Sequence, residues 1–333
     1  MSRKVKIDLG INGAFLTRRW EEPDNWMRLT KETGYDYHEF CGDVLDPFFS
    51  GDKEYQLETA RKTKEAAEKH GVTIVDIYTG VATHRFHGLA HSHPAVRARM
   101  RDWIVEAMDI ALAMGVTKLG GHWDALSVEV LEDPEKERAA IELLHNTFRE
   151  LAVIGKEKGM EGIYVEQMYI PSEVPWTMEQ SDEYLVAVNK DNPGCPVYLT
   201  VDVGHMAGMH YGLQGKDLEY EEWLRRFGAA CEVIHLQQTT RDASRHWTFN
   251  EEYNATGDIK MEEVLKALKW SHENYHRQPW AKYLAPAAQT TLVLEYIPGS
   301  TTTEERVLRE ISEGCSYLRN YVPKGGLEWE FDK

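Results

Sequence analysis

Short stretches rich in β-branched and aromatic residues alternate along the chain with longer stretches in which apolar residues recur every three or four positions. The first pattern predicts buried strands and the second predicts amphipathic helices. We predict strands at residues 5–11, 35–41, 72–78, 117–122, 162–168, 197–203, 231–237 and 291–296. We predict helices at residues 24–33, 53–70, 95–114, 134–158, 177–190, 219–227, 261–275 and 303–321. The chain therefore reads as eight strand–helix pairs.

Glycine follows several predicted helices just before the next strand, as in AEKHGVTIVDIY and LAMGVTKLGG. Such a glycine caps the helix and turns the chain back, which favours right-handed crossovers between parallel strands. Eight crossovers close a barrel. We therefore predict an α/β fold, a single-domain (β/α)8 TIM barrel over residues 1–322, with extended loops after its strands and a C-terminal extension at 323–333. An open doubly wound sheet is the alternative, but LGINGAFL after the first strand is not the GxGxxG of a nucleotide loop.

Composition and charge narrow the range of partners. The 333 residues are 42% apolar, which is enough for a large core, and their formal net charge is −17 with scattered Lys and Arg. Nucleic acid and anionic membranes attract clustered basic residues, so we expect neither as a partner. The N-terminal segment lacks the apolar run of a signal peptide, and no later run approaches the roughly 18 residues of a membrane span. We expect a cytoplasmic protein.

Side chains that commonly bind metals end four successive predicted strands: Glu166 in GIYVEQM, Asp202 in VYLTVDVGH, His235 in CEVIHLQQT and Glu295 in TTLVLEYI. In a TIM barrel the C-terminal ends of the strands meet at one mouth, where active sites lie. Three carboxylates buried near one axis are very unfavourable unless a cation neutralises them. The pattern predicts one divalent ion bound by all four residues. The alternative is that each acid separately pairs with an Arg or caps a helix.

Five further residues follow or end predicted strands, where they could contact a substrate: His205, Arg241, His122, Trp123 and His87. His205 comes three positions after Asp202, and Arg241 comes six positions after His235. A tryptophan ring such as that of Trp123 can stack on the apolar face of a sugar. For each of the five, an ordinary role in packing or in a surface ion pair is the alternative.

The order Glu, Asp-x-x-His, His-x5-Arg, Glu over eight strand–helix units resembles the xylose isomerase-like TIM barrel superfamily, and within it the sugar isomerase and ketose 3-epimerase group. The resemblance extends over almost the whole chain. It implies that the four strand-end residues bind one divalent ion, Mn²⁺, Mg²⁺ or Co²⁺, and that His205 and Arg241 contact substrate oxygens. One residue departs from the group: where its epimerases carry a second glutamate six positions after the first ligand, this chain has Ser172, followed by Glu173.

The ligand set and the resemblance together predict an enzyme that moves a proton next to a sugar carbonyl. A metal that binds the carbonyl and a neighbouring hydroxyl would stabilise an enediolate. Glu166 and Glu295, on opposite sides of the ligand set, are the expected catalytic acid–base residues. Because Ser172 departs from the epimerase pattern, we expect an aldose–ketose isomerase that acts on a free short or branched sugar such as D-apiose. A ketose 3-epimerase is one alternative, and a dehydratase or lyase acting on an inosose or a 3-keto-glycoside is another.

The segment PGSTTTEERV after the last predicted strand bears on the substrate and has the sequence of a helix cap. In it, Thr301 or Thr302 is followed three positions later by Glu304 or Glu305. These acids would repel a phosphate, so we expect a non-phosphorylated sugar as the small-molecule partner. The Trp-bearing segment 327–331 could pack against the barrel or contribute to an interface between subunits, so a homo-oligomer is compatible with the sequence.

Overall fold

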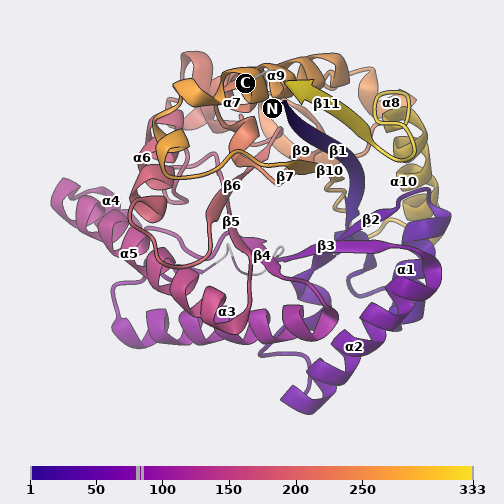
Figure 1. Ribbon diagram of the computed structural model, residues 1–333, viewed down its shortest axis with the longest axis horizontal. Helices are drawn as coiled ribbons and strands as arrows, with labels where there is room; N and C mark the ends of the chain where they lie inside the picture. Colours follow the sequence, from indigo (N-terminus) through magenta and orange to yellow (C-terminus); the bar gives the residue numbers. More distant parts are fainter. Residues whose placement is uncertain (1, 80–82, 84–85, 332–333) are drawn as a thin grey trace.

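Eight parallel strands close into a barrel in the computed structural model, which describes residues 2–79, 83 and 86–331 (Figure 1). The strands are β1 (Arg3–Asn12), β2 (Tyr37–Cys41), β3 (Thr73–Tyr78), β4 (Lys118–Gly121), β5 (Gly162–Glu166), β6 (Val197–Asp202), β7 (Val233–Leu236) and β10 (Gln289–Leu294). Each strand pairs with the next, and β10 closes the barrel on β1, with Leu292 opposite Leu9. The predicted single-domain TIM barrel is confirmed.

Helices between successive strands surround this barrel (Figure 1). The longer ones are α1 (Pro23–Glu32), α2 (Lys53–His70), α3 (Pro94–Met114), α5 (Pro134–Lys158), α6 (Met178–Asn189), α7 (Tyr220–Phe227), α9 (Met261–Asn274) and α10 (Glu304–Leu318), and two single turns are α4 (Val128–Leu131) and α8 (Glu251–Asn254). Gly71, Gly115 and Gly159 end α2, α3 and α5 with φ of 64°, 81° and 104°, as their position before a strand predicted. Within the described residues, no helix has both the length and the apolar character needed to cross a membrane.

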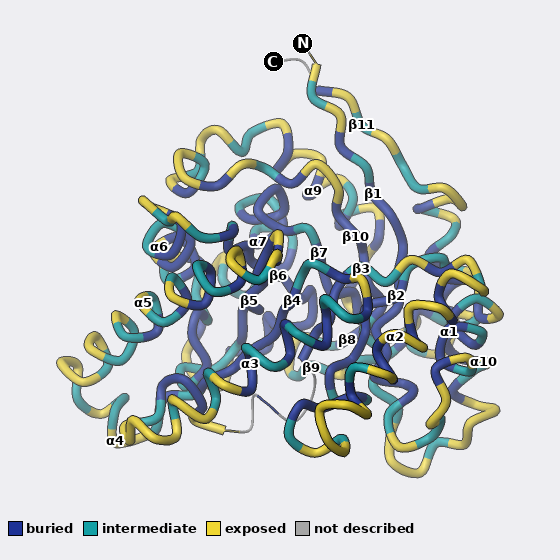
Figure 2. The backbone as a smooth tube through the Cα atoms, turned by 60° about the horizontal axis from the view of Figure 1, so that its bottom comes forward, coloured by how far each residue is buried: buried dark blue, intermediate teal, exposed yellow. Residues whose placement is uncertain are grey.

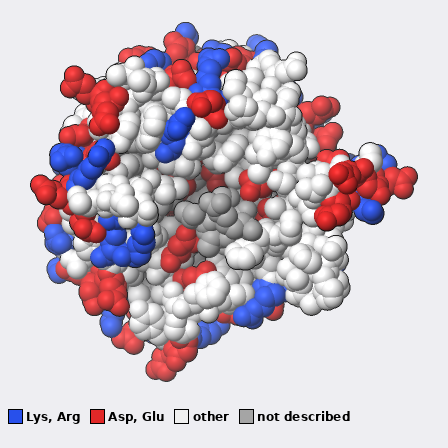
Figure 3. Space-filling model, turned by 180° about the vertical axis from the view of Figure 1, so that it is seen from behind, with Lys and Arg blue, Asp and Glu red and all other residues white. Residues whose placement is uncertain are grey.

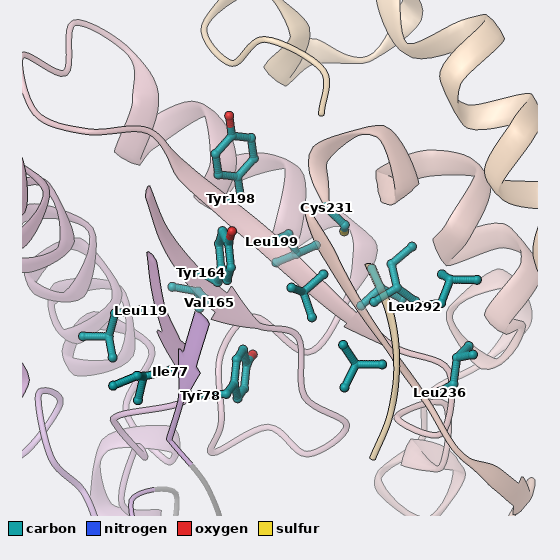
Figure 4. Close-up of a cluster of buried hydrophobic side chains, with 14 of the residues drawn as sticks. Ile77, Tyr78, Leu119, Tyr164, Val165, Tyr198, Leu199, Cys231, Leu236 and Leu292 are labelled. Carbon is teal, nitrogen blue, oxygen red and sulfur yellow. The ribbon is translucent and has the colours of Figure 1, made fainter. Parts of the chain in front are cut away.

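The barrel strands are buried, whereas the outer surfaces of the helices are exposed (Figure 2). Inside the barrel, Tyr78, Tyr164 and Tyr198 lie among aliphatic side chains from neighbouring strands (Figure 4). The rings of Tyr164 and Tyr198 meet edge to face at 6.0 Å, and the Tyr164 hydroxyl donates to Glu232 at 2.7 Å. The interior is therefore filled by side chains, and the polar site described below lies at one end of it.

Two elements go beyond the strand–helix repeat. The C-terminal strand β11 (Leu327–Phe331) pairs antiparallel with the first half of β1, with Trp329 opposite Val5, and this ribbon projects from the barrel (Figure 2). The predicted C-terminal extension thus packs against the barrel as an additional strand. The long insert after β7 forms a hairpin of β8 (Gln238–Thr240) and β9 (Ala243–Trp247), which the hydrophobic pattern did not predict.

Candidate metal centre

The four residues that end successive strands meet at the mouth of the barrel. Glu166 and Asp202 end β5 and β6, His235 lies in β7, and Glu295 directly follows β10. Each offers one ligand atom, and these atoms all lie within 4.8 Å of one another. Figure 3 looks onto the face where the strands end, and acidic side chains are visible in the hollow at its centre. The expected convergence of the four side chains is present, and their role as metal ligands stays a prediction.

His235 contacts carboxylates through both of its ring nitrogens. Its Nδ1 lies 2.9 Å from Glu166 Oε1 and 3.4 Å from Glu295 Oε2. Its Nε2 lies 3.1 Å from Oε1 of Glu39, a fully buried residue of β2 whose carboxylate also accepts a hydrogen bond from Asn12 at 2.6 Å. An imidazole that donates Nε2–H to a carboxylate presents the Nδ1 lone pair on its other side, which is a common arrangement around metal-binding histidines.

Asp202 is held by neutral donors. The side-chain amide of Gln237 lies 3.0 Å from each of its carboxylate oxygens, and the Gly204 N–H donates to Oδ1 at 2.6 Å. A Cβ at Gly204 would lie 2.2 Å from the Gln237 side chain, so the glycine in DVGH makes room for this contact. Burial raises the pKa of Asp202 to about 6, although nearby His205 acts in the opposite direction.

The charges of this group fit a cation. Burial lowers the pKa of His235, but Glu39, Glu295 and Glu166 together raise it well above its usual value. Burial raises the pKa of Glu166 and Glu295, but neighbouring imidazoles more than reverse this, so both pKa values are lowered. His235 acts on both glutamates, His205 also acts on Glu166, and His246 also acts on Glu295. Among the described residues, the buried Oε2 of Glu295 accepts no hydrogen bond of good geometry, and its nearest partners are imidazole nitrogens of His246 and His235 at 3.3 and 3.4 Å. A divalent ion would supply the missing positive charge and the missing partner, and three carboxylates with one imidazole suit Mn²⁺, Mg²⁺ or Co²⁺ better than a thiolate-bound structural zinc.

His205 lies against this group, and its predicted contact with substrate stays a prediction. Its Nδ1 hydrogen-bonds the Gln167 carbonyl oxygen at 2.8 Å, so Nδ1 carries the proton. Its Nε2 lies 3.6 Å from Asp202 Oδ2. The imidazole is buried and fixed, with Nε2 on the side of the carboxylates. This nitrogen is placed where it could meet an oxygen of a bound sugar.

Arg241 and Trp123 make their contacts elsewhere. The Arg241 guanidinium pairs with Glu219 at 3.2 Å, and its side chain is 61% exposed. Trp123 is fully buried, donates to the Thr79 hydroxyl at 2.7 Å and stacks on Phe148. The structure therefore places Arg241 in a surface ion pair and Trp123 in the packed core, and their predicted contacts with substrate stay predictions.

The two remaining candidates are histidines. His122 directly follows β4 and is 3% exposed, and neither ring nitrogen has a hydrogen-bond partner among the described residues. Its nearest acid is Asp124, 3.7 Å from Nε2. His87 is exposed and its Nδ1 hydrogen-bonds the Ala125 carbonyl oxygen at 2.9 Å. His122 thus keeps free hydrogen-bonding capacity, whereas His87 joins the loop after β3 to the loop after β4.

Two residues beside the group were missed from the sequence. His246, in β9, has Nδ1 3.3 Å from Glu295 Oε2 and is 21% exposed. Burial lowers its pKa, but the Glu295 carboxylate more than offsets this and raises the pKa to about 9. Glu39 is the other missed residue. A carboxylate inside a predicted buried strand was the signal for Glu39, whereas His246 lies in a polar hairpin with no comparable signal.

The chain belongs to the xylose isomerase-like TIM barrel family, because the model of that family matches residues 27–276. A D-erythrulose 1-phosphate 3-epimerase from Brucella abortus is 22% identical over 265 residues, which are 79% of this chain and 84% of the relative. The structure of a "Putative Xylose isomerase" from Rhodospirillum rubrum is similar with a TM-score of 0.81 and 23% identity, covering 95% of this chain and 100% of that one. D-psicose 3-epimerase from Clostridium cellulolyticum is similar with a TM-score of 0.66 and 16% identity, covering 95% and 99%.

Proposed function

We propose that this protein is a divalent-metal-dependent sugar isomerase or epimerase, and that its reaction is epimerisation at C3 of a ketose. The observation that carries the proposal is the placement of Glu166 and Glu295. They approach His235 Nδ1 from β5 and β10, which are not adjacent strands. Their side chains are 10% and 12% exposed, whereas Asp202 and His235 are closed to solvent. Two accessible carboxylates on separate sides suit a reaction that removes a proton from one face of a carbon and returns one to the other.

Glu166, Asp202, His235 and Glu295 would hold the ion. The bound ion would act as a Lewis acid that polarises the sugar carbonyl and makes the neighbouring C–H more acidic. One of the two glutamates takes the C3 proton, and the other returns a proton from the opposite face. Nε2 of His205 binds a substrate oxygen, since Nδ1 is already used by the Gln167 carbonyl.

We propose epimerisation in place of the aldose–ketose isomerisation that the sequence favoured. The Brucella relative and the Clostridium structure are both named as 3-epimerases. Isomerisation is the second candidate, because Ser172 stands where epimerases of the group carry glutamate and because the Rhodospirillum structure is named as a "Putative Xylose isomerase". D-apiose is the aldose that we propose to test for it.

We propose a non-phosphorylated substrate. Helix α10 begins after Thr303, one or two positions later than the predicted cap, and the Thr303 hydroxyl accepts the Arg306 N–H at 3.3 Å. Glu304 and Glu305 occupy the first turn of this helix, where they oppose the binding of a phosphate. The Brucella relative is named for a phosphorylated tetrulose, so both forms belong in the test.

The test is proton exchange read by NMR. The protein loaded with Mn²⁺, Mg²⁺ or Co²⁺ is incubated in D₂O with tetruloses, pentuloses and hexuloses, with erythrulose 1-phosphate and with D-apiose. We expect deuterium at C3 of one ketose and the appearance of its C3 epimer. Conversion of D-apiose to a ketose would indicate an isomerase and not an epimerase. Loss of water from a substrate would indicate a lyase. No exchange in any sugar, at any of the three metals, would overturn the proposal.

Single substitutions of the two glutamates distinguish an epimerisation mechanism with two bases from one with a single base. We expect Glu166→Gln and Glu295→Gln each to lower the rate of epimerisation by about 10³-fold, because one face of the carbon loses its base. With the remaining base, each variant should still exchange deuterium into one of the two epimers, and the two variants should prefer different epimers. Mn²⁺ binding is measured in parallel by calorimetry. If both variants exchange the same epimer, one base serves both steps and the two-base mechanism is wrong.

A further inference from the structure

We propose that His246 is a positioning residue for Glu295, delivered to the mouth of the barrel by the hairpin inserted after β7. The inference rests on the proposed function, because it concerns one of the two glutamates assigned to proton transfer. It is carried by the contacts of the β8–β9 hairpin with the candidate metal centre. None of the site predictions from the sequence included this residue.

The backbone of His246 is held in an uncommon conformation. Its φ is +50°, in the left-handed region that residues other than glycine rarely adopt. The side-chain carbonyl of Gln237 accepts the His246 N–H at 2.7 Å, and the His246 carbonyl accepts the Ile297 N–H at 3.4 Å. The same Gln237 donates to both oxygens of Asp202. The hairpin is thus fastened to the loop after β10 and to one of the candidate ligands, with His246 at the junction.

The imidazole of His246 is engaged on both sides. Its Nε2 lies 3.1 Å from the Ser244 hydroxyl. Its Nδ1 lies 3.3 Å from Glu295 Oε2 and 3.4 Å from the side-chain amide nitrogen of Gln237. A ring with both nitrogens engaged by the protein is suited to orienting a neighbour. This arrangement argues for a positioning role and against direct contact with the substrate.

Glu295 needs this partner once His235 binds a cation. In the structure, Glu295 Oε2 faces two imidazole nitrogens: His235 Nδ1 at 3.4 Å and His246 Nδ1 at 3.3 Å. A nitrogen that offers its lone pair to a metal carries no proton and cannot donate to Glu295. Nδ1 of His246, 3.3 Å away, is then the remaining imidazole nitrogen among the described residues that is close enough to donate to this oxygen. It would fix the direction of the carboxylate without occupying the ligand site.

The β8–β9 hairpin also holds Arg241 away from the candidate metal centre. The Arg241 main-chain N–H donates to Asp258 at 2.9 Å, and its guanidinium pairs with Glu219 on the exposed rim. His246 follows five positions later and returns to the centre. The loop after β7 therefore reaches the carboxylates through an imidazole, with the arginine turned outward.

Three variants test the inference: His246→Leu, which removes the donor, His246→Asn, whose amide can replace Nδ1–H, and Arg245→Gln as a control. Arg245 is the preceding residue of β9, and its guanidinium pairs with Asp242 at the surface. The measurements are the Kd of Mn²⁺ by calorimetry, and kcat and KM separately on the substrate identified by NMR. Thermal unfolding shows that each variant is folded.

We expect His246→Leu to weaken Mn²⁺ binding about tenfold and to lower kcat more than it changes KM. His246→Asn should retain most of the Mn²⁺ affinity and of the kcat that His246→Leu loses. Arg245→Gln should have the Kd and kcat of the wild-type protein. A folded His246→Leu protein with unchanged Kd and unchanged kcat would overturn the inference. Equal losses in the Leu and Asn variants would also overturn it, since the donor would then be irrelevant. An unchanged protein that binds no Mn²⁺ would instead remove the proposed function, so the two failures are distinguishable.

Discussion

Glu39 shows how a single buried residue can set the properties of a site it does not enter. Its carboxylate accepts the Nε2–H of His235 and leaves Nδ1 toward Glu166 and Glu295. Partners of this kind fix the tautomer of a metal-binding histidine and increase its basicity. Glu39 can therefore affect the candidate metal centre, although it lies on the side of the His235 imidazole that faces away from the other carboxylates.

We expect Glu39→Gln to weaken Mn²⁺ binding about tenfold. The neutral amide can still accept the His235 Nε2–H, but it lacks the negative charge that increases the basicity of this imidazole. Titration calorimetry at pH 7 measures the change. Glu328→Gln is the control, since Glu328 is 70% exposed on β11. Equal affinities in the two variants would show that Glu39 has no influence on the ligand.

His38 makes stability depend on pH. Burial lowers the pKa of His38 to about 3, and its Nδ1 hydrogen-bonds the Thr30 hydroxyl at 2.9 Å. In the unfolded chain the pKa is about 6.5, so between these values the unfolded state binds a proton that the folded state does not. This contribution is therefore complete above about pH 6.5 and is lost as the pH falls toward 3.

We expect His38→Gln to reduce the slope of the unfolding free energy against pH by about 1.4 kcal/mol per pH unit between roughly pH 5.5 and 4. Urea unfolding at several pH values measures both slopes. The variant loses stability at pH 7 as well, so the slopes are compared and not the absolute values. Parallel curves for the two proteins would contradict the burial of a neutral His38.

The candidate ligands could be predicted from the sequence, but their neighbours could not. Glu166, Asp202, His235 and Glu295 each end or follow an apolar strand, so a barrel brings them together whatever its loops do. The position of His246 depends on its own left-handed backbone conformation and on the hydrogen bond from its main-chain N–H to the Gln237 side chain, and neither feature leaves a periodic signal. Residues at the ends of barrel strands can be predicted from a sequence to form a site, whereas the loop residues around that site become known only from the structure.

At the scale of elements, the same contrast separates barrel strands from the added ones. The strands of the barrel are continuous apolar runs because both of their faces are buried, and all eight were predicted. β8 and β9 read QTT and ASRHW, and they form a hairpin through side chains such as Thr239, whose hydroxyl accepts the Arg245 N–H. Polar strands of this kind have no alternation that marks them before the fold is known.

β11 is a short strand whose contacts can be tested separately. Phe331 is 7% exposed, its ring stacks on that of His272 at 6.0 Å, and the Arg3 guanidinium lies 5.0 Å from the ring centre. We expect Phe331→Ala to lower the free energy of unfolding by about 3 kcal/mol, because it removes a buried ring from a strand that pairs with β1.

The matched control for this prediction is Glu328→Ala, which removes only an exposed ion pair with Lys4 and should cost under about 0.5 kcal/mol. Chemical denaturation measures both variants. Mn²⁺ affinity should be the same in both, since β11 pairs with the half of β1 farthest from the mouth. A loss of metal affinity in Phe331→Ala would indicate that the two ends of the barrel are coupled.

At the scale of the whole molecule, we expect the carboxylates at the mouth to make stability depend on a cation. A ligand that binds only the folded state at a concentration 100 times its Kd stabilises that state by about 2.7 kcal/mol. We expect Mn²⁺ at that concentration to raise the Tm and EDTA to reverse the change, as measured by calorimetric unfolding. The shift should be absent in the double variant Asp202→Asn, Glu295→Gln, and an equal shift in that variant would place the ion elsewhere.

The pairing of β1 with the last strands makes closure of the barrel a long-range event. The first half of β1 lies between β10 and β11, and the two ends of the described chain lie side by side (Figure 1). Closure therefore brings together residues as distant in sequence as Lys6 and Gln289. The loop entropy of such a contact must be overcome before the pairing can stabilise the chain, so we expect this closure to be slower than the pairing of successive strands.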